Sequence, residues 1–265
     1  MYIVAGIDVG CGSTKALLLD EERKVLGKGL ARTVANFPQV AREALDAALK
    51  EAGTKEEDIN YIATTGLGRY AIPFRDIQIT DITSGAKGAA FLFPGTKSVL
   101  DIGAQNTRAI KVSDTGRVKV FRTNDKCAAG SGSFVEKAAK YLEVSLEEVG
   151  TLSLMSQEPQ AISSVCAVLA ESEIINHVSA GKKVEDILKG VHSSLADRAL
   201  SLLKRVGLEE ELTLIGGVAK QAGMVEILAE KAKMKVNVSS EPEFVAALGA
   251  ALLALDRLKK KKSSS

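Results

Sequence analysis

Asp8-Val-Gly-Cys-Gly-Ser-Thr-Lys-Ala-Leu17 occurs a second time in this chain, as Asp101-Ile-Gly-Ala-Gln-Asn-Thr-Arg-Ala-Ile110. Four of the ten aligned positions are identical, and three more exchange Val for Ile, Lys for Arg and Leu for Ile. In both copies an apolar strand leads into an Asp-x-Gly turn, and a second strand follows. A repeat of this kind indicates a duplicated domain. The spacing of the copies, 101 − 8 = 93 residues, predicts a boundary near residue 95.

Each copy has the chemistry of a phosphate-binding turn. Glycine lets backbone N–H groups point into a concavity that holds phosphate oxygens, and Ser, Thr and Lys side chains add donors and positive charge. An Asp at the end of each strand can hold Mg²⁺ directly or through its waters, because Mg²⁺ keeps several water ligands. Two such turns facing across a cleft would bind a nucleoside triphosphate from both sides, whereas the alternative is a pair of ordinary β-hairpins. The residues predicted for this role are Asp8, Gly10, Gly12, Ser13, Thr14, Lys15, Asp101, Gly103 and Ala104.

The periodicity of apolar residues, with Gly or Asp residues between the segments, predicts strands that alternate with helices. This alternation indicates an α/β fold. The predicted strands are Ile3–Val9, Lys15–Leu19, Val25–Ala31, Ile59–Ala63, Ser98–Ile102, Arg108–Val112, Val118–Arg122 and Leu212–Ile215. The predicted helices are Gln39–Ala52, Ser84–Phe91, Ser133–Leu142, Val165–Ser179, Val184–Val206, Lys220–Lys231 and Glu243–Leu258.

The chain length suits one large domain or two small ones, since 265 residues compare with about 150 for a typical domain. With the duplication, we expect an N-terminal domain over residues 1–95 and a C-terminal domain over 96–258. Residues 259–265, four lysines and three serines, predict a flexible, solvated basic tail.

Composition excludes several classes of protein. Lys and Arg exceed Asp and Glu by only 35 − 33 = 2, which gives no reason to expect a nucleic-acid ligand. No apolar run reaches about 18 residues, so no membrane span is expected, and the N-terminal strand lacks the features of a signal peptide. Three widely spaced cysteines do not make a disulfide framework. We therefore expect the protein in the reducing cytoplasm.

Two other glycine-rich stretches are candidates for contact with a nucleotide. Leu212-Thr-Leu-Ile-Gly-Gly-Val-Ala219 predicts a strand, a double-glycine turn and a helix. Such a turn lets a flat ring approach the backbone and could seat adenine or ribose, although a tight strand–helix turn is the alternative. No P-loop motif occurs, and no stretch has all three glycines of the dinucleotide fingerprint. The residues that the two stretches would contribute are Gly130, Ser131, Gly132, Gly216 and Gly217.

Cys127 and Cys166 each lie just before or at the start of a predicted helix, where the helix N-terminus favours a thiolate and a bound anion. Two thiolates do not complete a four-cysteine iron–sulfur site, but a two-fold dimer would double them to four. The alternative is a pair of small buried cysteines. Cys11 lies inside the first phosphate turn, and we interpret it as a packing residue.

The remaining titratable side chains predict less. Glu173, on the helix that follows Cys166, either reaches a ribose or is a solvated carboxylate. His177 and His192 have no Cys or His at zinc-ligand spacing beside them, so zinc is not expected. Each His more simply caps or packs a helix.

Several of these stretches together point to one family. They are Gly6-Ile-Asp-Val-Gly10, Ser13-Thr-Lys15, Thr65-Gly-Leu-Gly-Arg69, Asp101-Ile-Gly-Ala-Gln105, Asn124-Asp-Lys-Cys-Ala-Ala-Gly-Ser-Gly132, Ser163–Ser172 and Gly216-Gly-Val-Ala219. The chain resembles the ATP-dependent activators of 2-hydroxyacyl-CoA dehydratases and, equally, the ATP-binding subunits of benzoyl-CoA reductase. The resemblance covers about residues 2–257. Its most specific parts are the two cysteine segments, because acetate and sugar kinases, heat-shock chaperones and actin share the phosphate turns.

The resemblance implies a duplicated, actin-like (ribonuclease H-like) two-domain ATPase fold with ATP and Mg²⁺ in a nucleotide cleft. It also implies one [4Fe-4S] cluster held by Cys127 and Cys166 of two subunits, in a homodimer or in a dimer with a related ATP-binding subunit. The implied role is ATP hydrolysis coupled to injection of single low-potential electrons into a partner iron–sulfur acyl-CoA dehydratase or reductase. Ferredoxin or flavodoxin is the implied electron donor. Asp8 and Asp101 would position Mg²⁺, and Gln105 would orient the attacking water.

Two stretches depart from the dehydratase-activator pattern and look more like the benzoyl-CoA reductase branch. Asp81-Ile-Thr-Ser-Gly85 stands where Glu and Cys-His are expected, and Ala104 and Asn106 replace Gly and Asp in the second turn. Two other functions are alternatives. A small-molecule kinase of the same fold gives the two cysteines no role, and an ATP-dependent clamp or chaperone would need a peptide-binding domain that the sequence lacks.

Overall fold

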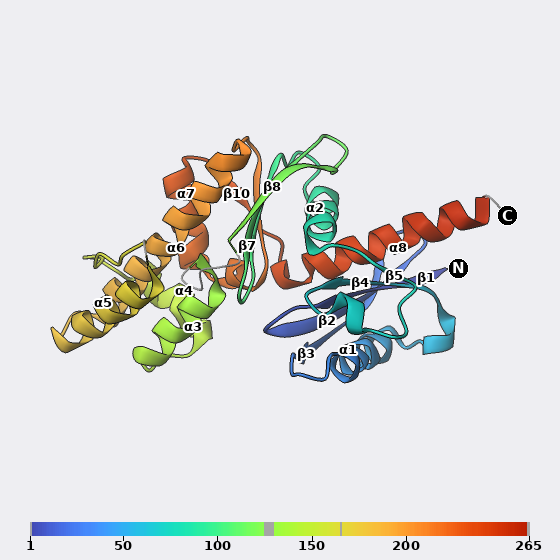
Figure 1. The fold of residues 1–265 in the computed structure, drawn as a ribbon, viewed down its shortest axis with the longest axis horizontal. Coiled ribbons are helices and arrows are strands. Elements are labelled where there is room, and N and C mark those ends of the chain that lie inside the picture. The colour runs from blue at the N-terminus through green and yellow to red at the C-terminus, as the bar shows by residue number, and fades with distance from the viewer. Residues whose placement is uncertain (1, 125–129, 165, 264–265) are drawn as a thin grey trace. The chain divides into compact units, whose positions relative to one another are not determined.

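The computed structural model describes residues 2–124, 130–164 and 166–263, and in it the chain forms two compact units (Figure 1). Unit 1 consists of the described residues of 1–95, 112–118 and 243–265, and unit 2 of those of 96–111 and 119–242. Each unit contains a five-stranded sheet. Among the helices that the structure describes, none is long and apolar enough to cross a membrane.

The sheet of unit 1 has the strand order β3-β2-β1-β4-β5. Neighbours β1, β2 and β3 are antiparallel, whereas β4 runs parallel to β1 and β5 runs parallel to β4. β1 is buried along its whole length because helices cover both faces of the sheet. The strands are β1 (Ile3–Val9), β2 (Ser13–Asp20), β3 (Val25–Arg32), β4 (Ile59–Gly66) and β5 (Ile77–Gln78).

Helices α1 (Phe37–Ala52) and α8 (Val245–Ser263) cover opposite faces of this sheet (Figure 1). Successive strand residues point to opposite faces, so Ile7 packs into the cluster with α1 and Val4 into the cluster with α8. Gly6 lets α8 approach closely, since a Cβ at Gly6 would collide with the Ala247 carbonyl oxygen. Helix α2 (Asp81–Leu92) packs beside α8.

Helix α8 corrects the predicted domain boundaries. The sequence predicts residues 243–258 in the second domain and a flexible tail after them, whereas 243–263 belong to unit 1 and α8 continues to Ser263. The physical reason is the apolar face of α8. It packs against Val4, Leu17 and Leu19 of the sheet and forms a hydrophobic cluster of unit 1 with them. The lysines also have local partners: Lys259 Nζ donates to the Glu21 carbonyl oxygen (3.1 Å), and Lys262 Nζ lies 3.7 Å from the centre of the Tyr2 ring.

The sheet of unit 2 repeats the plan of unit 1, with the order β10-β9-β6-β7-β8. β6 pairs with β7 in antiparallel fashion, as β1 does with β2, and β9 runs parallel to β6, as β4 does to β1. The two Asp-x-Gly turns therefore occupy equivalent positions, between the first two strands of each sheet. The strands are β6 (Ser98–Ile102), β7 (Thr107–Val112), β8 (Val118–Asn124), β9 (Leu212–Ile215) and β10 (Val236–Asn237).

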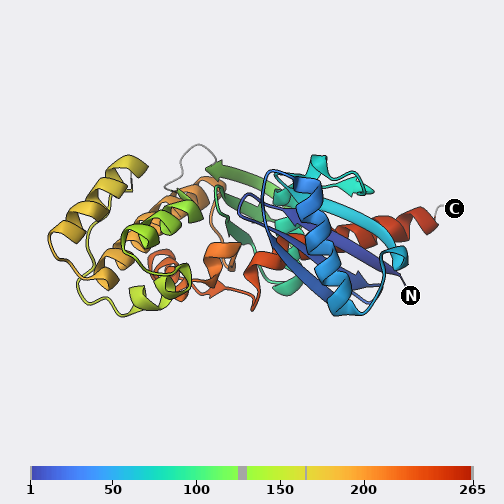
Figure 2. The same cartoon turned by 90° about the horizontal axis from the view of Figure 1, so that it is seen from below.

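The helices of unit 2 gather on one side of its sheet and share one core with it (Figure 2). Helix α4 is missing from the sequence prediction, although Ser145 and Glu148 form a capping box at its start, and this pattern was the available signal. The helices are α3 (Gly132–Tyr141), α4 (Leu146–Leu154), α5 (Ala167–Ser179), α6 (Val184–Val206) and α7 (Ala222–Ala232). Short 3-10 turns lie at Glu56–Asp58, Arg69–Ala71, Gly217–Lys220 and Pro242–Phe244.

Candidate functional site

The first predicted phosphate turn joins β1 to β2. Asp8 lies near the end of β1 with its carboxylate nearly buried, and its Oδ2 lies 3.7 Å from Lys15 Nζ. Lys15 Nζ also donates to the Ser13 carbonyl oxygen (3.2 Å). Gly10 leaves no room for a side chain, because a Cβ there would lie 2.9 Å from the same carbonyl oxygen. The turn thus combines a carboxylate, an ammonium group and accessible backbone.

Successive side chains of β2 point to opposite faces of the sheet, so the predicted phosphate donors of this turn do not all lie on one face. Ser13 and Lys15 are half-buried on one face of the strand, whereas Thr14 points to the other face and is fully buried. The Thr14 hydroxyl hydrogen-bonds to Oγ1 of the partly buried Thr33 (2.9 Å). The structure thus gives the Thr14 hydroxyl a protein partner, and its role as a phosphate donor stays a prediction. Gly12, in contrast, is exposed in the turn.

The second predicted turn repeats the ion pair of the first. Arg108 Nη1 lies 3.0 Å from Asp101 Oδ2, and the two residues are cross-strand partners, as Asp8 and Lys15 are. With its amide oriented so that both polar atoms are paired, Asn106 accepts a hydrogen bond from Arg108 Nη2 (3.2 Å). Arg108, which the sequence analysis did not select, therefore joins the carboxylate to the turn.

Residues 130–133, at the start of α3, support the second turn through backbone hydrogen bonds. The Gly132 N–H donates to the Gly103 carbonyl oxygen (2.9 Å), and the Ser133 N–H donates to the Ala104 carbonyl oxygen (2.8 Å). Because these donors hold the turn, they are not directed at a ligand. The structure brings together the predicted residues Gly103, Ala104, Gly130, Ser131 and Gly132, while Gln105 is exposed on the turn.

The double-glycine turn follows β9 and lies against the Asp101 end of β6. Gly216 has a φ of +90°, and a Cβ there would lie 2.7 Å from Asp101 Oδ1, so both conformation and space require glycine. Gly217 is exposed, and nothing lies within 4 Å of where its Cβ would be. β6 and β9 are parallel, so both end at one edge of the sheet, the edge where α/β proteins bind ligands. Gly217 therefore offers open backbone beside a carboxylate.

A tightly held segment leads to Cys166. The Ser163 N–H donates to Glu173 Oε2 (2.5 Å). The Ser163 carbonyl oxygen accepts hydrogen bonds from Ser194 Oγ (2.9 Å) and Arg198 Nη2 (3.3 Å), both on α6. The Glu173 carboxylate thus accepts a hydrogen bond within unit 2, and its contact with a ribose stays a prediction.

Cys166 is the N-cap residue of α5 and is partly exposed. The backbone N–H groups of Leu169 and Val168 lower the pKa of its thiol below the ordinary value, and the charge of Arg198 acts in the same direction.

Cys127 lies outside the described residues. Within residues 2–124, 130–164 and 166–263, no group of three or more His, Cys, Asp and Glu side chains could hold a metal ion. Cys166 would therefore need donors from outside that part of the chain to bind one.

A buried histidine connects α6 to the start of α7. His192 is fully buried, with Ser153 Oγ 2.9 Å from Nδ1 and Gln221 Oε1 2.7 Å from Nε2. Because the Gln221 oxygen accepts, Nε2 carries the proton. Burial lowers the pKa of His192 from 6.5 to about 4. Gln221 comes directly after the 3-10 turn that begins at Gly217, so the neutral histidine helps to fix the double-glycine turn.

Comparison with known proteins finds one family that matches most of the chain. Residues 5–254 match the BadF/BadG/BcrA/BcrD ATPase family. The chain is 43% identical to the activator of lactoyl-CoA dehydratase of Anaerotignum propionicum, over 98% of this chain and 100% of the relative. It is 40% identical to one of the subunits of the benzoyl-CoA reductase of Thauera aromatica, over 95% and 93% of the two chains.

A solved structure agrees over almost the whole chain. The activator of 2-hydroxyisocaproyl-CoA dehydratase from Clostridium difficile, with bound ADPNP, has a TM-score of 0.94 and 36% identity and covers 99% of this chain and 98% of its own. The predicted family resemblance and the two-domain actin-like ATPase fold are both confirmed.

Proposed function

The chain belongs to the BadF/BadG/BcrA/BcrD ATPase family, and we propose that it couples ATP hydrolysis to the injection of low-potential electrons into a partner acyl-CoA dehydratase or benzoyl-CoA reductase. The ATPase activity follows from the family. The choice of partner is supported by relatives that are a dehydratase activator and a reductase subunit. No observation favours the kinase or chaperone alternatives.

The proposed nucleotide chemistry starts from the two matched ion pairs. Mg²⁺ with ATP would bind at Asp8 and Asp101, since carboxylates are its preferred protein ligands. A divalent cation at these oxygens competes with Lys15 and Arg108 for the same charge. The released ammonium and guanidinium groups would then bind phosphate oxygens. The residues that the proposal assigns to phosphate binding are Gly10, Gly12, Ser13, Lys15, Gly103, Ala104 and Arg108.

Two further roles complete the proposed ATPase site. Gln105 is exposed on the second turn, where its amide can orient a water molecule for attack. Gly216 and Gly217 would seat the adenine or ribose, and the open backbone at Gly217 supports this role. Thr14 and Glu173 have protein partners in this structure, Thr33 Oγ1 and the Ser163 N–H, and their contacts with the nucleotide stay predictions.

The single observation that carries the electron-transfer part is the Cys166 thiol at the start of α5. A lowered thiol pKa favours the thiolate, the form that binds iron–sulfur clusters. Cys166 therefore fits one ligand position of a [4Fe-4S] cluster. Cys127 would supply a second and the same pair in a partner subunit, identical or related, the other two. A bound cluster would supply single-electron transfer at low potential. The reducing cytoplasm is the proposed location, because it keeps cysteine thiols available as ligands.

If ATP binding lowers the reduction potential of the cluster, the nucleotide must bind the oxidised and the reduced protein with different affinities. Moving a one-electron potential by 100 mV corresponds to ~2.3 kcal/mol. A ligand shifts an equilibrium only through its differential affinity for the two states. That free energy is about a fiftyfold difference in nucleotide affinity between oxidised and reduced protein.

Anaerobic calorimetry with ADPNP and Mg²⁺ tests the proposal on oxidised and dithionite-reduced protein. We expect affinities that differ, by about fiftyfold for each 100 mV of shift, in wild type and in the Cys11→Ala control, and equal affinities in Cys166→Ala. Equal affinities of the two redox states in the wild-type protein would overturn the electron-transfer proposal and leave the ATPase assignment intact.

A further inference from the structure

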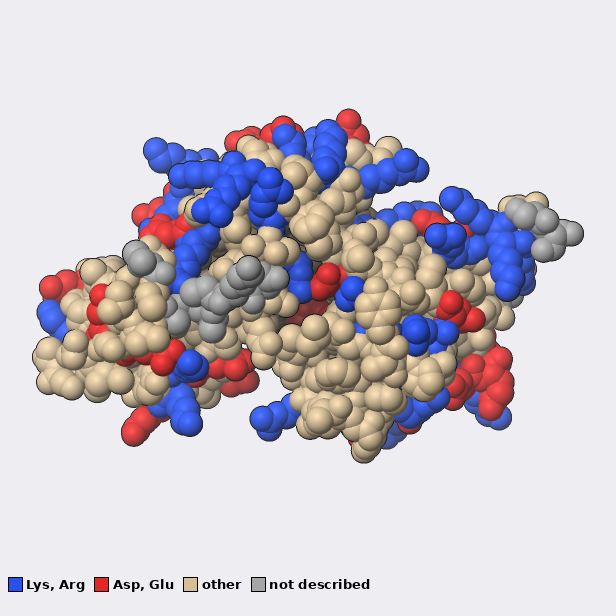
Figure 3. Space-filling model, viewed as in Figure 1, with Lys and Arg blue, Asp and Glu red and all other residues tan. Residues whose placement is uncertain are grey.

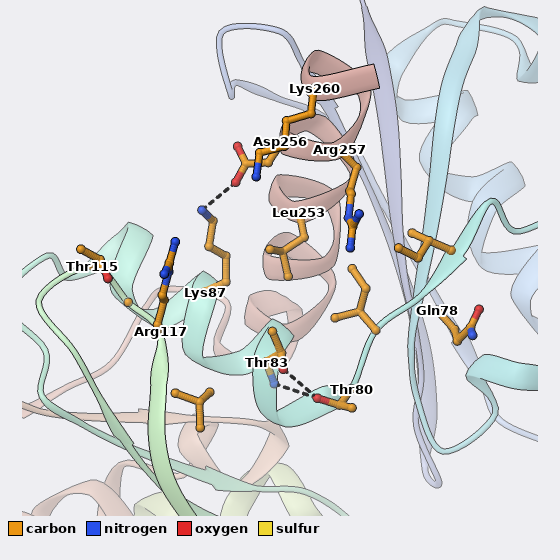
Figure 4. A pocket seen from close by; sticks show the side chains of 14 residues that line it. Gln78, Thr80, Thr83, Lys87, Thr115, Arg117, Leu253, Asp256, Arg257 and Lys260 are labelled. Atoms are coloured by element: carbon orange, nitrogen blue, oxygen red, sulfur yellow. Dashed lines mark hydrogen bonds and ion pairs between the residues drawn. The ribbon is translucent and has the colours of Figure 1, made fainter. Parts of the chain in front are cut away.

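Unit 1 contains a pocket of about 750 Å³ that is separate from the phosphate turn (Figure 4). Its walls come from β5, from the first two turns of α2, from the 115–118 turn and from the C-terminal half of α8. None of residues 10–15 lines it. Its volume lies within the range of small-molecule sites, about 300–1,000 Å³.

The lining of this pocket has an excess of positive charge. The lining includes four basic side chains and one carboxylate, which gives it 4 − 1 = 3 positive charges. The basic residues are Lys87, Arg117, Arg257 and Lys260, and the acidic residue is Asp256. The whole chain has a net charge of only +2, so this concentration is local. On the face drawn in Figure 3, Lys and Arg side chains also gather over the C-terminal end of α8.

The single carboxylate is already neutralised. Asp256 Oδ2 lies 2.8 Å from Lys87 Nζ, and Asp256 Oδ1 lies 3.8 Å from Arg23 Nη2 outside the pocket. Figure 4 shows Lys87 pointing at Asp256, while Arg117 comes from the 115–118 turn and Arg257 from α8. Among the described side chains, no carboxylate lies within 4 Å of either guanidinium. The guanidinium groups of Arg117 and Arg257 can therefore donate hydrogen bonds to a ligand.

The rest of the lining is suited to an organic molecule. Ile77, Ile79 and Leu253 contribute apolar surface. Thr80 and Thr83, at the start of α2, add hydroxyl groups at the positive end of a 12-residue helix. A ligand that matches this lining has anionic groups at one end and an apolar body at the other.

We propose that this pocket binds a small organic phosphate with at least two phosphate groups and an apolar or heterocyclic body. Guanidinium groups recognise phosphate through paired hydrogen bonds, which favours phosphate over a single carboxylate. Coenzyme A and the nucleoside triphosphates share this chemistry. This choice of ligands rests on the proposed function, in which ATP is the substrate of the chain and a coenzyme A thioester is the substrate of its partner. The site is distinct from the ATPase site and would make the protein responsive to the concentration of that phosphate.

The test is calorimetry on the full chain, saturated beforehand with ADPNP and Mg²⁺ at the ATPase site. Coenzyme A is titrated in one arm, further ADPNP in a second, and inorganic pyrophosphate is the competitor in both. The test variant is Arg117→Glu/Arg257→Glu. The control variant, Lys119→Glu/Lys261→Glu, makes the same charge change on β8 and α8 at exposed residues that do not line the pocket.

We expect one saturable site per chain for coenzyme A or for a second ADPNP, and the active arm identifies the ligand. Binding should weaken at least tenfold in the test variant and less than twofold in the control, and pyrophosphate should compete. Absence of saturable binding in both arms, or equal affinity in the two variants, would overturn the proposal. ATP hydrolysis should persist in the test variant, so failure here is distinguishable from failure of the ATPase assignment.

Discussion

Arg108 Nη1 lies 3.0 Å from Asp101 Oδ2 across the β6–β7 ladder. The equivalent pair in unit 1, Lys15 and Asp8, has the same register but a separation of 3.7 Å. The duplicated turns thus hold one carboxylate and one cation each. Both carboxylates are nearly buried, where charge interactions are stronger than at the surface.

Removal of either carboxylate should impair ATP hydrolysis while leaving the fold intact. Asp101→Asn keeps the shape and removes the charge that we assign to Mg²⁺. We expect a loss of about a hundredfold or more in kcat, the scale for removing one electrostatic group from an active site. Steady-state phosphate release at several Mg²⁺ concentrations measures it. Asp114→Asn, at an exposed residue of the 112–118 turn, is the control, and equal activity of the two variants would contradict the assignment.

Substitution of Gly217 separates ligand contact from folding. A side chain at Gly217 meets nothing within 4 Å, so Gly217→Val should change the free energy of unfolding by no more than about 0.5 kcal/mol. If adenine or ribose approaches this backbone, ADPNP affinity should fall by about tenfold or more. Urea unfolding and calorimetry on the same sample measure both quantities. Unchanged affinity would remove Gly217 from the nucleotide site.

The buried His192 should make stability depend on pH. Its pKa is 6.5 in the unfolded chain and about 4 in the folded protein, so the unfolded state binds the extra proton first as pH falls. The contribution is complete above pH 6.5 and is lost progressively towards pH 4, by about 3 kcal/mol in total. Urea unfolding from pH 7 to 4.5 should show a shallower decline for His192→Gln. His177→Gln is the control, and identical slopes for all three proteins would contradict the burial argument.

The Cys166 thiolate should form at lower pH than an ordinary thiol. Its interaction with the N–H groups of Leu169 and Val168 lowers the thiol pKa from 9.0. In cluster-free protein, the rate of iodoacetamide labelling at Cys166, followed by peptide mass spectrometry, should reach half its maximum below pH 9. Arg198→Gln should move this midpoint upwards, because the positive charge of Arg198 also favours the thiolate. A midpoint at or above pH 9 in wild type would contradict the proposed metal-binding chemistry.

Much of the fold was predictable because the repeat and the apolar spacing are local signals. β1, β6, β9 and α6 have the predicted bounds. The two-residue strands β5 and β10 have no periodic signal, since pairing with a neighbour defines them. No local pattern indicates that α8 belongs to unit 1, because the partner of an apolar helix face depends on contacts distant in sequence.

The residues of the candidate site were predictable where they belong to a short sequence motif. Asp8 and Asp101 lie at equivalent strand ends, and Gly216 has the positive φ that its turn requires. Strand alternation, which buries Thr14, is visible in the sequence only when the face of the strand is known. Glu173 and Arg198 meet at Ser163 through tertiary packing, so no sequence spacing could pair them.

The most direct test of the central claim is anaerobic purification, with a visible spectrum, an iron count and a molar mass on one sample. We predict a brown protein with the mass of a dimer and about four irons per two chains. Cys166→Ala should be colourless, and Cys11→Ala should match wild type. A colourless monomer that still hydrolyses ATP would contradict the electron-transfer role and leave an ATPase without a cluster.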